Sequence, residues 1–423
     1  MSPQATFSFI FEGRSIEARP GDTIGAAMFR AGVRIFTRSF KNHRPRGLLC
    51  VNGKCPNCIM EVDGIPSVRV CTAPARPGVE VKAQNVFPSL NFDLLAVSQK
   101  FSWLMPVGWY YKAFTHPEAW RLVEPWIRKA AGLGKAPPTM EAFTQANEPA
   151  PENENAPRIQ KQPEYDHEYL HTDLAVIGGG PAGLSAAIEA ARQGLRVTLI
   201  DDQPELGGHL RYAPGGSEQL SELARLVQAE ASIEVLSGSF CFGLYEGNLL
   251  GIYRPRGDAT SVERLMHLRA GRVTVATGTY ESPLLFENND LVGVMLSSGV
   301  ERLIGLYGIS PGRRAVVIGA GPRAAEIAAM LKHAGTGIAA TVPLEEVAAA
   351  TGKGRVQGIR AGGSHISCDL IVVCGHIVPN AGLLHQAGAR LAWDEAAGAF
   401  LPADLPAGVE AVGEVTGQNL APA

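Results

Sequence analysis

The 423-residue sequence lacks a strong net charge, a long apolar run and a regular cysteine framework. Its 38 Lys and Arg residues nearly balance 41 Asp and Glu residues, which leaves a net charge of −3. Such a balance provides no global attraction for nucleic acid or for an acidic membrane surface. We therefore expect no nucleic-acid partner.

Membrane and export features are also missing. No apolar run approaches the roughly 20 residues that span a bilayer, and the opening residues lack the basic start and apolar core of a secretion signal. Seven cysteines, an odd number crowded toward one end, make a poor disulfide framework for a chain of this size. We expect a cytoplasmic protein with reduced thiols and no integral membrane segment.

The texture of the sequence changes along a chain that is too long for one ordinary core. Residues 1–86 combine short strand-like runs with one helical segment, for which Asp22 or Thr23 is the N-cap. Residues 87–165 begin as an aromatic, helical segment and end in a Pro-, Asn-, Gln- and Glu-rich stretch expected to be an extended linker. From about residue 166, strands and helices alternate as in a doubly wound sheet.

Four of the cysteines follow the pattern C-x4-C-x2-C with a fourth after twelve more residues: Cys50, Cys55, Cys58 and Cys71. This is the spacing of plant-type [2Fe-2S] ligands. Gly53 and Pro56-Asn57 allow one loop to turn three thiolates inward. The residues between Cys58 and Cys71 predict a hairpin that returns the fourth thiolate to the site.

Two other interpretations of these cysteines stay open at this point. Four thiolates also bind zinc, although structural zinc sites usually have two C-x2-C pairs and this segment has one. The second alternative is four thiols without any metal. The remaining cysteines, Cys241, Cys368 and Cys374, stand in apolar stretches and are expected to fill the core.

A dinucleotide motif follows the linker. Gly178, Gly180 and Gly183 form G-x-G-x-x-G between an apolar strand and an Ala-rich helix, which is the context that this fingerprint requires. The first glycine makes a tight turn, the second admits a pyrophosphate, and the third lets helix and strand pack closely. The next strand ends in Asp201, suitably placed to accept a hydrogen bond from a ribose hydroxyl.

A second motif, Gly319-x-Gly321-x-x-Ala324, repeats this design of strand, turn and helix. The strand after it ends with neither the acid that favours NAD nor the arginine that favours NADP. We therefore expect a reduced NAD-type subdomain that does not dock NADH well. Hydride would then not enter at this site, and the subdomain would be kept for packing and assembly.

These motifs resemble known redox domains. Residues 1–86 resemble a β-grasp ferredoxin domain, and the later motifs resemble the two-dinucleotide flavoproteins such as thioredoxin and glutathione reductases. The resemblance implies an α/β, Rossmann-type fold with an FAD-type domain at 166–285 and 386–423 and an NAD-type subdomain at 286–385. It implies FAD at the first motif, with NAD as the alternative, and adds these cofactor-binding residues: Gly207, Gly208, Thr277, Gly278, Gly413 and Glu414.

The segments "RIFTRSFKNHRPRG", "GWYYKAF" and "TYESPLLFENNDLVGVML" resemble the large (alpha) subunit of heterotetrameric sarcosine oxidase. The likeness covers essentially the whole chain and extends to subunits of hydrogen cyanide synthase, opine oxidases and D-hydroxyproline dehydrogenase. Sarcosine oxidase large subunits keep the β-grasp shape without its cysteines and continue into a folate-binding half. This sequence has all four cysteines and ends at residue 423, so it looks closer to the amino-acid and opine dehydrogenases.

The resemblance implies an oxidoreductase subunit that acts on CH-NH bonds within a heteromeric complex. A smaller partner subunit that resembles D-amino-acid oxidases would oxidise the substrate, of sarcosine, D-amino acid, hydroxyproline or opine type, with an FMN at the subunit interface. This chain would pass electrons through its dinucleotide cofactor and its [2Fe-2S] cluster to a quinone or a soluble carrier, and it has no catalytic residue assigned. The alternatives are a self-sufficient NAD(P)H-dependent flavin and iron–sulfur reductase, and a non-catalytic scaffold that holds a structural NAD.

Overall fold

The computed structural model describes residues 6–104, 108, 112–131, 165–255, 263–418 and 420. The chain forms two compact units, each assembled from two stretches: Met1–Ala142 with Pro283–Gly375, and Phe143–Ser282 with His376–Ala423. Most of the predicted linker, residues 132–164, lies outside the described residues. The four-part domain division given above stays a prediction.

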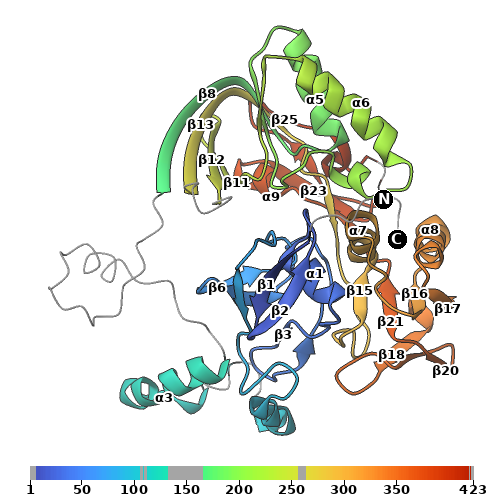
Figure 1. Cartoon of the computed structure of the whole chain (residues 1–423). Coiled ribbons are helices and arrows are strands. Elements are labelled where there is room, and N and C mark those ends of the chain that lie inside the picture. Colours follow the sequence, from blue (N-terminus) through green and yellow to red (C-terminus); the bar gives the residue numbers. More distant parts are fainter. Residues whose placement is uncertain are drawn as a thin grey trace. The chain divides into compact units, whose positions relative to one another are not determined.

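The N-terminal part of the first unit is a small five-stranded sheet with the order β2-β1-β7-β5-β6 (Figure 1). Strand β1 (Phe7–Phe11) pairs in parallel with β7 (Glu80–Lys82) and antiparallel with β2 (Arg14–Ala18). Strand β5 (Ile59–Val62) continues the sheet from β7 and pairs with β6 (Ile65–Arg69). This arrangement confirms the mixed β-grasp type of fold that the sequence predicted for the N-terminal region.

One helix, α1 (Ile24–Arg30), packs against this sheet, and six of its seven residues are buried. Thr23 is the N-cap, and its hydroxyl accepts a hydrogen bond from the first turn at 3.2 Å. Asp22, the other candidate cap, instead forms an ion pair with Arg30. Arg30 also donates to the carbonyl oxygen of Tyr307 at 3.1 Å, which ties α1 to the second stretch of this unit.

That second stretch contains a four-stranded parallel sheet of order β15-β21-β16-β17 and a separate three-stranded antiparallel sheet. Four of its central residues, Ala315 to Ile318, are fully buried, as expected for a sheet covered on both faces. The elements are β15 (Val294–Leu296), α7 (Ser297–Tyr307), β16 (Arg314–Ile318), α8 (Gly321–His333), β17 (Gly337–Val342), β18 (Val347–Thr351), β19 (Gly358–Ala361), β20 (Ser364–Ser367) and β21 (Leu370–Val373).

The second unit is built on a sheet of order β10-β9-β8-β13-β12-β11, with β25 also paired to β13. Its strands are β8 (Tyr165–Ile177), β9 (Val197–Ile200), β10 (Ile233–Leu236), β11 (Phe240–Tyr245), β12 (Leu249–Arg254), β13 (Glu263–Val275) and β25 (Val409–Ala411). Strands β8 and β13 pair in parallel along nearly their whole length, whereas β11 and β12 extend the sheet antiparallel. The alternation of strand and helix confirms the predicted Rossmann-type fold class.

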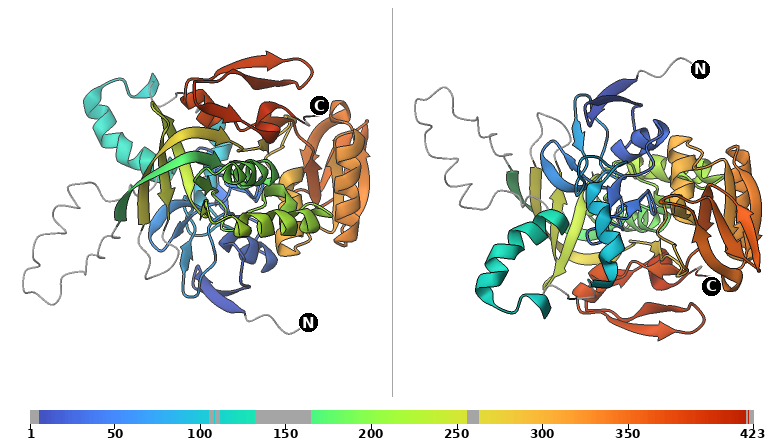
Figure 2. Two further views of the ribbon diagram at one scale, coloured as in Figure 1. Left: turned by 90° about the horizontal axis from the view of Figure 1, so that it is seen from above. Right: turned by 90° about the horizontal axis from the view of Figure 1, so that it is seen from below.

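Two helices of the second unit, α5 (Pro181–Arg192) and α6 (Gly216–Ala229), lie side by side (Figure 2). Helix α5 packs against β8 and β9 through the buried side chains of Leu184, Ala187 and Ile188. Their spacing of three and four residues places them on one face of the helix. No helix among the described residues is long and apolar enough to span a bilayer.

The remaining elements are short or peripheral. They are β3 (Thr37–Arg38), β4 (Pro45–Arg46), η1 (Leu94–Leu104), α3 (Pro117–Ala131), η2 (Gly208–Arg211), β14 (Thr279–Glu281), η3 (Leu344–Glu346), β22 (Ile377–Pro379), α9 (Gly382–Gln386), β23 (Arg390–Asp394), β24 (Ala399–Asp404) and η4 (Gly413–Thr416). Strands β3 and β4 pair with each other near the cysteine loop, and β14 pairs with β22.

The start of α7 packs directly on the chain that leads into the predicted cluster loop. The backbone amide of Leu296 donates to the carbonyl oxygen of Leu49 at 3.0 Å. A Cβ atom on Gly299 would lie only 2.5 Å from the same oxygen. The absence of a side chain at Gly299 therefore permits this contact between the parallel sheet region and the β-grasp region.

We expect Gly299→Ala to lower the stability of the first unit by about 1–3 kcal/mol, because the added methyl group overpacks this contact. Gly305→Ala is the matched control, since Gly305 is an exposed residue of the same helix. There the better helix propensity of Ala should leave stability unchanged or raise it by up to about 1 kcal/mol. Calorimetry of both variants provides the comparison, and equal melting temperatures would contradict the proposed contact.

Candidate functional site

The four cysteines of the predicted cluster come together in the β-grasp region. The Sγ atoms of Cys50 and Cys55 are 3.3 Å apart, and the thiol of Cys71 is hydrogen-bonded to those of Cys50 and Cys58. Cys50, Cys58 and Cys71 are each only 2% exposed, whereas Cys55 is half-buried. Residues 21 positions apart in the sequence thus form one sulfur-lined site.

The predicted hairpin is what returns Cys71 to this site. Strands β5 and β6 pair antiparallel from Ile59 and Arg69 to the turn. Asp63 and Gly64 at that turn both have positive φ, 49° and 79°, which is the conformation that joins strands by a tight two-residue turn. The hairpin prediction is therefore confirmed.

The loop from Cys50 to Cys58 supplies amide donors as well as sulfur. Its backbone turns through positive φ at Gly53, 75°, a conformation that glycine adopts without strain. Backbone amides of Asn52 and Cys55 donate to the Cys50 sulfur, and that of Asn57 donates to Cys55. Hydrogen bonds of this kind are one means by which proteins set the potential of an iron–sulfur cluster.

The crowded thiols do not share one protonation behaviour. Hydrogen bonds from Cys55 and Cys71 lower the pKa of Cys50, which outweighs the opposing effect of its burial. The same hydrogen bonds, together with burial, raise the pKa values of Cys55 and Cys71. One thiolate is thus stabilised by its neighbours' protons.

The four sulfurs fit the ligand set of a [2Fe-2S] cluster, in which each of two irons takes two protein ligands. The described residues contain no group of three or more His, Cys, Asp or Glu side chains gathered as ligands of a single metal ion. Four cysteine sulfurs also suit zinc, so the metal at this site is part of the proposal below.

The first dinucleotide motif forms a tight turn between β8 and α5. Gly178 has φ of 111°, and a Cβ atom there would lie 2.3 Å from the carbonyl oxygen of Ala276. A Cβ atom on Gly183 would lie 1.8 Å from the carbonyl oxygen of Gly178. Gly180 is the N-cap of α5, and a Cβ atom there would make only an ordinary contact, at 3.9 Å. Gly178 and Gly183 thus serve internal packing, and Gly180 leaves space in front of the helix.

Asp201 holds this turn from the end of β9. Its carboxylate accepts hydrogen bonds from the backbone amides of Gly179 and Gln203, the latter at 2.7 Å. Burial raises the pKa of Asp201 above its usual value, and these hydrogen bonds offset part of that effect. The predicted contact of Asp201 with a ribose hydroxyl stays a prediction.

Gly179 is a residue of this site that the sequence analysis missed. Its amide donates to Asp201, and its carbonyl oxygen accepts from the amide of Gly207 at 2.7 Å. A Cβ atom at Gly179 would lie 2.5 Å from a methyl carbon of Leu206. The run of three consecutive glycines from Gly178 was the available indication, because the G-x-G-x-x-G pattern does not itself require glycine there.

The other predicted cofactor residues lie around the same turn in the second unit. A Cβ atom on Gly208 would be 3.0 Å from Cα of Gly180, and one on Gly413 would be 2.6 Å from Cβ of Ala182. Gly208 and Gly413 therefore both flank the start of α5. The structure brings these glycines together from three separate parts of the sequence.

Thr277, Gly278 and Glu414 connect the strands next to this turn. The Thr277 hydroxyl donates to the carbonyl oxygen of Asn380 at 2.8 Å, and the carbonyl oxygen of Gly278 accepts from the amide of Asn380 at 2.9 Å. The Glu414 carboxylate accepts from the hydroxyl of Thr279 at 2.9 Å. These residues fix the segment where the chain leaves the second unit, and their contacts with a cofactor remain predictions.

The second glycine motif has the same strand, turn and helix, with a different environment. A Cβ atom on Gly319 would be 2.9 Å from Cβ of Cys374. Arg323, in the first turn of α8, forms two hydrogen bonds of 2.6 Å with the carboxylate of Glu301 on α7. Strand β17 ends at Val342 without an acidic residue. The expected weak docking of NADH stays a prediction.

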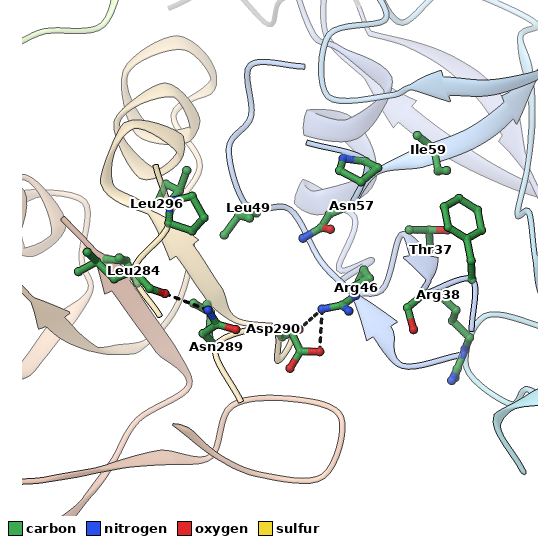
Figure 3. Close-up of a pocket in the computed structure, with 16 residues that line it drawn as sticks. Thr37, Arg38, Arg46, Leu49, Asn57, Ile59, Leu284, Asn289, Asp290 and Leu296 are labelled. Carbon is green, nitrogen blue, oxygen red and sulfur yellow. Dashed lines mark hydrogen bonds and ion pairs between the residues drawn. The ribbon is translucent and has the colours of Figure 1, made fainter. Parts of the chain in front are cut away.

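A pocket of about 360 Å³ adjoins the cysteine loop within the first unit (Figure 3). Pro56 and Asn57 of that loop form part of its wall. Arg46 and Asp290 reach toward each other inside it and form an ion pair of 2.7 Å. Arg44 binds the same carboxylate at 2.7 Å. Two arginines of the basic segment thereby hold the loop that contains Asp290.

A buried charged group supports the same pocket from behind. Arg38 donates to the carbonyl oxygens of Leu90, at 2.6 and 2.9 Å, and of His43, at 2.8 Å. Burial lowers the pKa of Arg38, and the nearby Asp93 carboxylate opposes that effect. Asp93 is also 2.9 Å from Nδ1 of His43. The sequence analysis missed Asp93, because its segment was interpreted by its aromatic residues alone.

Comparisons with known proteins agree with this architecture. Residues 4–86 match the 2Fe-2S iron-sulfur cluster binding domain, and residues 172–347 match the pyridine nucleotide-disulphide oxidoreductase domain. The alpha subunit of sarcosine oxidase from Rhizobium meliloti is 32% identical over 96% of this chain and 43% of that subunit. An opine oxidase subunit from Agrobacterium tumefaciens is 31% identical over 38% of this chain and 35% of its own length.

A crystal structure of L-proline dehydrogenase from P. horikoshii has a similar fold. It aligns with 98% of this chain and 70% of its own, with a TM-score of 0.68 and 20% sequence identity. The likeness therefore covers both units and supports the fold. The chain spans less than half the length of the sarcosine oxidase subunits that it matches, 43% and 41% for two of them.

We expect Cys58→Ala to remove the iron-dependent absorption and the paramagnetic signal of the reduced protein, because the cluster requires four sulfur ligands. Cys374→Ala is the matched control, since Cys374 belongs to the same unit and lies outside the sulfur-lined site. Iron analysis and low-temperature electron paramagnetic resonance on anaerobically purified protein measure the effect. Full iron content in Cys58→Ala would contradict the assignment of this ligand.

Gly180→Ala should weaken dinucleotide binding at least tenfold and leave folding intact. The added methyl group meets nothing closer than 3.9 Å inside the protein, but it occupies space that a pyrophosphate requires. Gly183→Ala should instead destabilise the unit, because its Cβ atom would clash at 1.8 Å. Thermal melting of the apoprotein and titration with dinucleotide separate the two effects. Normal affinity in Gly180→Ala would refute the pyrophosphate position.

Proposed function

We propose that this chain, a homologue of the alpha subunits of sarcosine oxidase over 96% of its length, is the electron-transfer and scaffold subunit of a heteromeric, flavin-dependent amine or amino-acid dehydrogenase. Substrate oxidation at a CH-NH bond takes place on a partner subunit. Because the chain covers less than half of those relatives, the activity of the complete enzyme is part of this proposal.

One observation carries the proposal. Four cysteine sulfurs converge at one site in a 2Fe-2S type domain, and the same chain has a dinucleotide-binding turn in its second unit. A flavin receives a pair of electrons, whereas an iron–sulfur cluster passes electrons one at a time. A chain that binds both groups suits the transfer of electrons from an oxidised amine to a separate acceptor, a quinone or a soluble carrier.

The second unit binds the dinucleotide, and FAD is the form that we propose. The turn from Gly178 to Gly183 and the first amides of α5 face the pyrophosphate, and Asp201 orients the turn through its bond to Gly179. Glu414, fixed by Thr279, lies on the ribityl side. NAD is the alternative at this site and would make the chain a scaffold in which the dinucleotide does not turn over.

The pocket beside the cysteine loop is the proposed site of an FMN shared with the partner. It offers the guanidinium groups of Arg38 and Arg46 and the hydroxyl of Thr37, which are suitable donors for a phosphate. Phe40, 42% exposed, and Leu284 provide apolar surface for a ring. The position next to Asn57 of the cysteine loop suits electron transfer to the cluster.

The partner is proposed to be a smaller flavoprotein subunit that resembles D-amino-acid oxidases. The relatives support a complex, because sarcosine oxidase and opine oxidase are named as subunits. The first unit also exposes large apolar side chains, each 61–76% accessible: Phe87, Phe92, Trp103, Leu122 and Trp126. Aromatic side chains at this density are typical of surfaces that a partner covers.

Reduction of the purified complex tests the proposal. The chain is expressed with its neighbouring flavoprotein subunit, purified without oxygen and mixed separately with sarcosine, D-amino acids, hydroxyproline, opines and NADH. We expect one of the amine or amino-acid substrates to reduce the cluster, which appears as a low-temperature paramagnetic signal, and NADH to reduce it at least a hundredfold more slowly. Acid extraction and the absorption spectrum then identify flavin or NAD in the second unit.

Two results would overturn the proposal. Rapid reduction of the isolated chain by NADH would make it a self-sufficient reductase. Extraction of NAD without flavin, together with substrate turnover that is unaffected in Cys58→Ala, would make it a scaffold. In the proposed function, Cys58→Ala leaves substrate-dependent bleaching of the partner's flavin intact and lowers reduction of the external acceptor at least a hundredfold.

A further inference from the structure

A second pocket of about 500 Å³ lies in the first unit, away from the cysteine loop. Its volume is within the range of small-molecule sites, about 300–1,000 Å³. It is formed by the end of α1 and the chain after it, by the residues that lead into β15, β16 and β21, and by the connection between β18 and β19. The lining residues include Phe29, Arg34, Leu48, Arg313, Arg355 and Asp369.

The pocket lies at the amino-terminal edge of the parallel sheet. Gly293 directly precedes β15, Arg313 precedes β16 and Asp369 precedes β21, and these three strands run parallel. The second glycine motif begins at Gly319, after the carboxyl end of β16. Doubly wound sheets bind dinucleotides at that carboxyl edge, so this pocket is a separate site.

Arg34 is fixed in the pocket wall by its own surroundings. Its guanidinium stacks on the ring of Phe29 at 3.9 Å from the ring centre. Its Nη1 atom donates to the carbonyl oxygens of Phe29 and Val33 at 2.6 and 3.2 Å. Nε and Nη2 have no hydrogen-bond acceptor among the residues that the structure describes. The side chain is therefore held in place with donors still available to a ligand.

A second positive charge stands close to this one. Arg355 is exposed and forms no ion pair or side-chain hydrogen bond with any described residue. Burial lowers the pKa of Arg34, and the charge of Arg355 lowers it further, whereas Asp369 raises it. Two guanidinium groups that repel each other across a concave surface stabilise an anion placed between them.

The carboxylate that lines the pocket is already occupied by the backbone. Asp369 accepts hydrogen bonds from the amide of Arg313, at 3.0 and 3.1 Å, and from the amide of Arg314 at 2.8 Å. It forms no ion pair with a guanidinium among the described residues. With Arg34, Arg313 and Arg355 against Asp369, the lining carries three positive charges and one negative charge.

We propose that this pocket binds a small organic dianion, either a phosphate monoester or a dicarboxylate. Arg34 and Arg355 bind the anionic groups through forked hydrogen bonds. The apolar walls, which include Leu48, Met295 and Val356, contact the carbon part of the ligand. Leu48 is two residues before Cys50, so the ligand connects the chain that leads into the cysteine loop with the parallel sheet.

Calorimetric titration of the cofactor-loaded protein in a phosphate-free, low-salt buffer tests the proposal. The probes are glycerol 3-phosphate, succinate and, as an uncharged reference, glycerol. We expect one of the two dianions to bind saturably at one site per chain and glycerol not to bind. Arg355→Gln should weaken that binding at least tenfold. The probe that binds identifies the phosphate monoester or the dicarboxylate as the ligand class.

Arg360→Gln is the matched control, because Arg360 is an exposed arginine of β19 outside the pocket. Its ion pair with Glu287, at 3.6 Å, is also exposed, so its loss should change binding less than twofold. The proposal is overturned if neither dianion binds saturably. It is equally overturned if binding survives in Arg355→Gln, or if both variants weaken it equally, since the anion would then bind elsewhere or without specific contact.

Discussion

The close approach of four cysteine sulfurs is the constraint on which the rest of the first unit depends. Three of them come from one loop, and the fourth returns on the β5–β6 hairpin. Buried thiols in mutual contact require a rigid enclosure, since each loses solvation without gaining a strong partner unless a metal is bound. The contact of α7 with Leu49, which the missing side chain of Gly299 permits, closes that enclosure on one side.

The arginines of this unit divide into two groups with different consequences. Arg38, Arg44 and Arg46 meet carboxylates or carbonyl oxygens of the protein, so their charges serve to fix loops around the pocket beside the cysteine loop. Arg34 and Arg355 face each other without a carboxylate between them. A charge that is satisfied internally holds structure, whereas a repulsive pair at a concave surface favours an anionic ligand.

Local patterns predicted much of the candidate site. The cysteine spacing identified the loop and its hairpin, and the first glycine motif identified a turn whose close contacts, such as that of Gly183 with Gly178, require glycine for steric reasons. Asp93 and Asp290 were missed. Asp93 contacts His43 from 50 residues away in the sequence, and Asp290 contacts Arg44 from 246 residues away. An isolated aspartate has no local pattern that indicates such a partner.

The sequence by itself determined the types of site, because ligand spacing and glycine turns are properties of consecutive residues whose backbone must bend within a short length. Only the tertiary structure decided which distant residues share a site. The chain leaves the first unit and later returns to it, so that residues near positions 34 and 355 line one pocket. Such a meeting depends on how whole sheets and helices pack, and packing is decided by the fit of many buried side chains together.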